Sequence, residues 1–98
     1  MAFSIRFSEE KNQLLKATRG VGFDEVILHL SSGGLLADKE HISQKRTHQR
    51  IYVIKIEKYV YVVPYVVNTQ SNEIFLKTIY PSRKFTKQYF KKGGQDAK

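Results

Sequence analysis

Three runs of apolar residues in the second half of the chain, 50–57, 59–67 and 73–80, predict the centre of the fold. Each is dense in Val, Ile, Tyr and Phe, and short polar gaps separate them. These residue types are typical of β-strands, so we predict an antiparallel meander. Residues 3–7 alternate between apolar and polar positions, which predicts a further short strand.

The middle run, 59–67, is apolar on both faces, so we expect a central strand that is covered on both sides. Pro64 lacks an N–H group, which predicts a bulge there or the end of pairing on one side. The run 50–57 alternates between two faces, one with Tyr52, Ile54 and Ile56 and the other with Ile51, Val53 and Lys55.

Two helices are expected before the meander. Ser8 is a suitable N-cap, and Gly20 can take the left-handed position that ends a helix near Arg19. We expect Leu14 and Leu15 to point inward. The second helix begins after Gly22, and its spacing places four apolar residues on one face. These residues are Phe23, Val26, Ile27 and Leu30.

Between the second helix and the meander, residues 35–37 predict a brief extended piece, and the polar residues 38–49 predict a long loop. After Pro81 the pattern predicts a basic helix that Ser82 caps. Its inward residues are Phe85, Tyr89 and Phe90.

The order of elements predicts one α+β domain, residues 1–92, followed by a disordered tail, residues 93–98. Its sheet is antiparallel and consists of the first strand and the meander. Two helices pack on one face of the sheet, and a short helix follows the last strand.

Charge narrows the class of partner. The 98 residues include 17 Lys and Arg but 9 Asp and Glu, a formal net charge of +8 that favours polyanions. No apolar run reaches the roughly 20 residues that span a bilayer, and no signal peptide is evident, so we expect no membrane association. The absence of Cys suits a cytoplasmic protein.

Several segments resemble BrnT-type toxins of type II toxin–antitoxin systems. The segments 7–12, 19–26 and 77–86 are similar to that family's motifs and occur in the same order, and Arg50 matches an Arg that opens a family strand. Arg19 replaces the family's His before Gly-Val.

The resemblance implies a RelE/ParE-like fold and a toxin that inhibits translation by cleaving RNA without a metal ion or other cofactor. It also implies a cognate antitoxin protein as partner. The implied roles carry over most directly to Arg50, Arg83 and Lys84.

Metal-independent RNA cleavage needs a general base, a general acid and cations for the phosphorane. We predict His48 as acid or base, with Arg50 and Arg83 holding the phosphate. The predicted substrate-binding residues are Lys84, Tyr80, Arg46 and Lys77. The three histidines lack the spacing of a metal site, so none is predicted.

The alternative is a non-catalytic basic module, or an inactive toxin homologue, that binds nucleic acid or an acidic protein. The two differ in one geometric respect. Catalysis requires His48, Arg50 and Arg83 to converge on one phosphate, whereas binding requires only a broad stripe of cations. The sequence leaves the oligomeric state and the RNA preference open.

Overall fold

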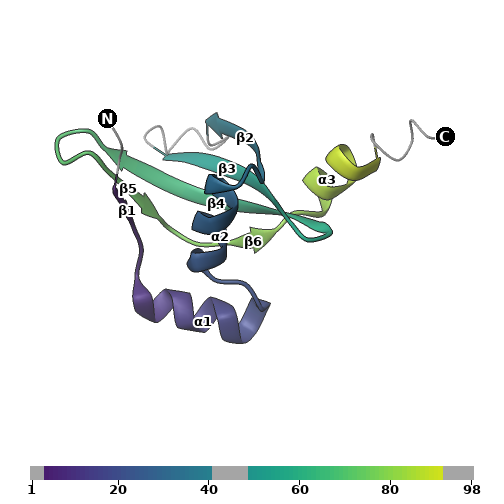
Figure 1. Ribbon diagram of the computed structural model, residues 1–98, viewed down its shortest axis with the longest axis horizontal. Coiled ribbons are helices and arrows are strands. Elements are labelled where there is room, and N and C mark those ends of the chain that lie inside the picture. The colour runs from purple at the N-terminus through teal and green to yellow at the C-terminus, as the bar shows by residue number, and fades with distance from the viewer. Residues whose placement is uncertain (1–3, 41–48, 92–98) are drawn as a thin grey trace.

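A mixed β-sheet lies at the centre of the computed structural model, which describes residues 4–40 and 49–91 (Figure 1). The elements, in chain order, are β1 (Ser4–Arg6), α1 (Glu9–Arg19), α2 (Phe23–Ser31), β2 (Leu35–Glu40), β3 (Gln49–Ile56), β4 (Tyr59–Asn68), β5 (Glu73–Leu76), β6 (Tyr80–Pro81), α3 (Arg83–Thr86) and a π-helical turn, η1 (Lys87–Lys91). The predicted α+β class is confirmed.

The sheet has the strand order β1-β5-β4-β3-β2, and β6 pairs with β4. The antiparallel meander is confirmed for β3, β4 and β5. The prediction of a wholly antiparallel sheet was wrong, because β1 runs parallel to β5, with Ser4 opposite Glu73 and Arg6 opposite Phe75. A parallel neighbour requires a long crossover, and here the whole domain between β1 and β5 provides it.

Pro64 lies where β4 changes partners. β5 pairs with β4 from Tyr65 onward, and β6 pairs with Tyr61 and Val62. Between these two pairings, the N–H of Lys77 donates to the carbonyl of Pro64 at 2.8 Å. The predicted end of pairing at Pro64 is therefore confirmed, and the missing N–H costs no ladder hydrogen bond.

The polar segment after residue 37 is not all loop. Residues 35–40 form β2, an edge strand antiparallel to β3, with Asp38 opposite Tyr52 and Lys39 opposite Ile51. Pairing with the longer β3 gives this polar segment hydrogen bonds that its own composition did not predict. Residues 41–48 and the predicted disordered tail, 93–98, lie outside the described residues.

The caps of α1 are as predicted. Ser8 accepts a hydrogen bond from the N–H of Lys11, and Gly20 has a φ of 74°. Leu15 is buried, but Leu14 is 55% exposed, so its predicted inward position was wrong. The position that α1 buries instead is Asn12, whose Oδ1 accepts from the N–H of Phe23 at 2.7 Å. This hydrogen bond ties the first turn of α2 to α1.

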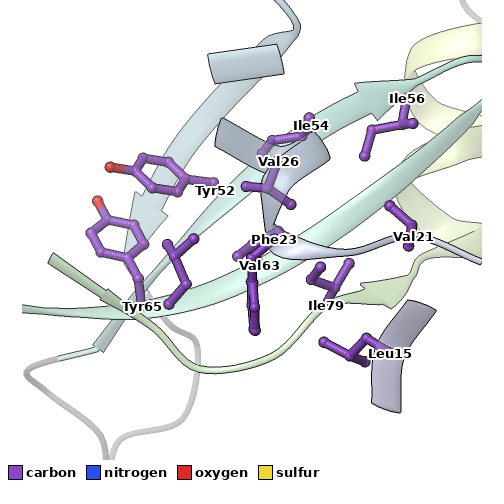
Figure 2. Packing of buried hydrophobic residues seen from close by; sticks show 11 residues of the cluster. Leu15, Val21, Phe23, Val26, Tyr52, Ile54, Ile56, Val63, Tyr65 and Ile79 are labelled. Atoms are coloured by element: carbon purple, nitrogen blue, oxygen red, sulfur yellow. The ribbon is translucent and has the colours of Figure 1, made fainter. Parts of the chain in front are cut away.

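The two faces of the sheet have separate cores. On the side that α1 and α2 cover, which we call the α1–α2 side, Phe23 and Val26 pack on Ile54 and Val63 (Figure 2). On the opposite side, the α3 side, the aromatic residues of α3 and η1 pack on a smaller cluster. Its buried members are Ile51, Val53, Val60 and Val62.

α3 therefore covers the face that α1 and α2 leave open. Two anchors hold it there: the N–H of Ser82 donates to the carbonyl of Val60 at 2.9 Å, and the N–H of Val60 donates to Thr86 Oγ1 at 3.0 Å. No helix in the described part of the chain is long and apolar enough to cross a membrane.

Candidate nucleic-acid interface

Arg50 is held in a hydrogen-bonded cluster on the α1–α2 side. Its Nε donates to Asp38 Oδ1 at 3.1 Å and to the Tyr65 hydroxyl at 3.2 Å, and its Nη2 donates to the Asp38 carbonyl at 3.1 Å. The Tyr65 hydroxyl also donates to Asp38 Oδ1, at 2.6 Å. The Tyr52 ring stacks on the Tyr65 ring with 4.0 Å between the ring centroids, and both hydroxyls point to the same side (Figure 2).

The protonation states of this cluster favour a structural role. Burial raises the pKa of Tyr65, and the hydrogen bond to Asp38 raises it further. Burial also raises the pKa of Tyr52, so both phenols are neutral at physiological pH. The hydrogen bonds to Tyr65 and Asp38 raise the pKa of Arg50. The guanidinium charge is thus offset by a carboxylate in direct contact, which weakens its pull on a phosphate.

Arg83 and Lys84 lie far from Arg50. Both are exposed in α3, on the α3 side, whereas Arg50 projects from the opposite face. Arg50 pairs with Tyr65, but α3 is anchored at Val60, five residues along β4 or roughly 16 Å away at the usual strand rise. Figure 1 shows α3 beside the hairpin between β3 and β4. The structure does not bring Arg50 and Arg83 together.

Tyr80 and Lys77 lie on the α3 side with Arg83 and Lys84. Tyr80 is opposite Val62, whose side chain faces α3, and the Tyr80 residue is 39% exposed. Lys77 is exposed, and its Nζ lies 5.8 Å from the ring centroid of Phe75. Four of the residues predicted for the site therefore share this side.

Lysine ammonium groups on the α3 side lie over aromatic rings. Lys39 Nζ is 5.4 Å from the ring centroid of Phe85, and Lys84 Nζ is 5.9 Å from the same centroid. Lys55 Nζ is 5.6 Å from that of Phe90. These distances are within the range of cation–π attraction, which leaves the positive charge accessible to solvent.

Carboxylates are distributed unevenly between the two sides. Side chains are described for residues 4–39 and 50–90, and within them five acids belong to the α1–α2 side: Glu9, Glu10, Asp24, Glu25 and Asp38. On the α3 side, Glu73 contacts Arg6 at 3.2 Å, and Glu57 is in the turn between β3 and β4. The cations of the α3 side include Arg6, Lys39, Lys55, Lys77, Arg83, Lys84 and Lys87. This side is therefore the electropositive one.

A pocket of about 470 Å³ opens at the turn between β4 and β5. The Val66 and Phe75 side chains give it an apolar wall, and Thr69, Gln70 and Glu73 are also part of its lining. Val66 and Phe75 are register partners on the α3 side, so the pocket adjoins the same electropositive surface.

Sequence reasoning did not assign a role to Lys39, Lys55 or Phe75. Lys55 and Ile51 were placed on one strand face, which was a usable signal, because the same alternation puts Lys39 and Phe75 on that face of the sheet. What was missing was the side on which α3 packs.

The predicted residues His48 and Arg46 lie outside the described residues, as does His41. The imidazole that the structure describes is that of His29 in α2, whose Nδ1 is 2.8 Å from the Glu25 carbonyl. Across residues 4–40 and 49–91, no group of three His, Cys, Asp or Glu side chains is arranged to hold a metal ion.

Comparisons of the chain with protein families, with curated proteins and with solved structures give no match. The resemblance to BrnT-type toxins and the RelE/ParE-like assignment consequently stay predictions, and functional inference has to begin from the surface of this molecule.

Proposed function

We propose that this domain binds single-stranded nucleic acid across the α3 side of its sheet, with RNA as the ligand that the family resemblance implies. The observation that carries the proposal is the pairing of lysines with aromatic rings on this side. Lys39, Lys55 and Lys77 each lie within 6 Å of a ring centroid, on three different strands or strand ends.

This combination suits a nucleic-acid strand because each component contacts a different part of it. Ammonium groups neutralise phosphates and release the counterions condensed on them. Exposed rings provide flat surfaces on which unpaired bases stack. Phe75 and Tyr80 are 37% and 39% exposed, so both aromatic residues are open to solvent on this side. An acidic protein would need the cations but would have less use for the rings.

Cleavage of the bound RNA is the second candidate, within a divergent toxin of RelE/ParE-like fold. It is favoured by the proximity of Tyr80, Arg83 and Lys84 in the sequence and at one end of the α3 side. The two arginines of the predicted catalytic group lie on opposite faces, so cleavage would have to use Arg83 without Arg50. His48 stays the predicted acid or base, and a cognate antitoxin stays the proposed partner.

Binding can be tested by fluorescence anisotropy with a labelled single-stranded RNA of about 10 nucleotides, a length within the usual site size for such surfaces. We expect log Kd to rise with log salt, with a slope of about 0.7 for each phosphate contacted. The double variant Arg83→Gln/Lys84→Gln should bind more weakly and show a shallower slope.

The matched control is Lys11→Gln/Arg19→Gln, which removes the same charge from α1 on the opposite side of the sheet. Equal weakening by both double variants would contradict the proposal, because affinity would then follow net charge alone. Gel analysis of the RNA after incubation separates cleavage from binding. If the native chain binds the RNA but leaves it intact, the result would argue against the nuclease and leave the binding proposal in place.

A further inference from the structure

The pocket at the β4–β5 turn gives the α3 side a cavity that polar residues help to line. Phe75 and Val66 provide apolar lining, and Gln70 and Glu73 are among the polar residues that line the pocket. The turn itself is braced, since Asn68 Oδ1 accepts from the N–H groups of Gln70 and Ser71 at 3.0 and 3.3 Å. The lining is thus held by a fixed loop.

Cations flank this pocket. Lys77 Nζ lies 5.8 Å from the Phe75 ring centroid, and Arg6 is the register partner of Phe75 on the neighbouring strand β1. A chain of phosphates that passes the pocket would therefore meet the positive charge of Lys77 beside Phe75, whereas Glu73, 3.2 Å away, offsets the charge of Arg6. An unpaired base carried by that chain could then lie against the ring.

Glu73 supplies a group that distinguishes bases. Its Oε2 accepts from Arg6 Nη1 at 3.2 Å, and this exposed ion pair partly offsets its charge. An ionised carboxylate accepts hydrogen bonds and donates none. It therefore favours a base that carries an amino group over one that has a carbonyl oxygen at the same position.

We propose that this pocket binds one unpaired base of the nucleic acid held on the α3 side, and that it prefers a base with an exocyclic amino group. The inference rests on the proposed function and adds sequence preference to it. Phe75 stacks on the base, Glu73 accepts from the amino group, and Lys77 contacts an adjacent phosphate.

The test compares two single-stranded RNAs of about 10 nucleotides, one of cytosine and one of uracil, because these pyrimidines have the same shape and differ only in the group at C4 and in the proton on N3. Anisotropy should give a lower Kd for the cytosine RNA, by about tenfold, as one good base contact provides. In Glu73→Gln the ratio of the two Kd values should fall toward one, because a glutamine amide also donates to uracil.

The ratio is the quantity that matters, since removing the Glu73 charge also releases Arg6 and raises affinity for any polyanion. Phe75→Leu keeps an apolar wall but removes the flat ring, and it should weaken both RNAs by about tenfold. The Arg6→Gln variant should weaken both RNAs slightly and keep the cytosine preference. Matching urea midpoints establish that each variant is folded.

Equal, tight binding of both RNAs by the native chain would overturn the base pocket and leave the binding function standing. A cytosine preference that survives in Glu73→Gln would overturn the role of Glu73. Failure to bind either RNA would overturn the proposed function, and the base pocket with it.

Discussion

On the α1–α2 side of the sheet, Lys16 and Arg50 contact carboxylates, whereas four lysines on the α3 side lie over aromatic rings. Lys16 Nζ is 2.7 Å from Asp24 Oδ2, and Arg50 Nε is 3.1 Å from Asp38 Oδ1. On the α3 side, Lys39, Lys55 and Lys77 contact aromatic rings instead. A cation paired with a carboxylate has its charge offset, but a cation over a ring still attracts a polyanion. The comparison suggests that one side maintains the fold and the other meets the partner.

The largest expected effect is the loss of unfolding free energy when a core aromatic residue is removed from the α1–α2 side rather than from the α3 side. Phe23→Ala should lower the free energy of unfolding by about 3–5 kcal/mol, because its ring is fully buried between the helices and the sheet. Phe85→Ala on the α3 side should cost clearly less, since Phe85 is only partly buried and packs on the smaller cluster. Urea unfolding of both variants measures the difference, and equal losses would contradict the assignment of the fold to one side.

A smaller effect is expected from Tyr65→Phe, which removes the hydroxyl that joins Asp38 and Arg50. The variant should lose about 1 kcal/mol of unfolding free energy near neutral pH. The pKa of Tyr65 is raised in the folded state, so the stability that it contributes is complete below its unfolded pKa of about 10 and declines as pH rises further.

Urea unfolding between about pH 8 and about pH 11 checks this sign. The gap between the native chain and Tyr65→Phe should narrow as pH increases, although Tyr52, whose pKa burial also raises, keeps some alkaline sensitivity in both. A gap that stays constant would mean that the hydroxyl is not insulated from solvent as the structure indicates.

The smallest effect on stability is expected from Lys55→Gln on the α3 side, which should change the free energy of unfolding by no more than about 0.5 kcal/mol. The same change should weaken binding of single-stranded RNA and reduce the salt slope by about 0.7. Lys11→Gln in α1 serves as the control and should alter neither the stability nor the slope. A large stability loss in Lys55→Gln would show that the α3 side is also structural.

Local signals predicted the helices well because their causes are local. Ser8 and Gly20 act within a few residues of the termini that they cap, and the spacing of Phe23 and Val26 fixes the buried face of α2. The same signals failed to separate Leu14 from Leu15. One residue rotates the helix by about 100°, and the orientation of α1 depends on its contact with α2 through Asn12.

Non-local pairing set the limit of what the sequence could tell about the site. Strand alternation assigned residues to two faces of the sheet, but it did not show which face α3 would cover. The lysines of β2 and β3 could therefore not be placed on the same surface as α3. The contact between Arg50 and Tyr65 joins residues 15 positions apart. A cation that looked free in the sequence was therefore already partnered in the fold.

The parallel pairing of β1 with β5 affects how the molecule is made. Ribosomes extend the chain from its amino end, so Ser4 is synthesised long before Glu73, the residue opposite it. Until β5 leaves the ribosome, the first strand has no neighbour in the sheet, and the flank of the base pocket that Arg6 provides is incomplete. Closing such a distant pair is also slow compared with forming a helix. The electropositive side is thus finished only near the end of synthesis, when both strands are present.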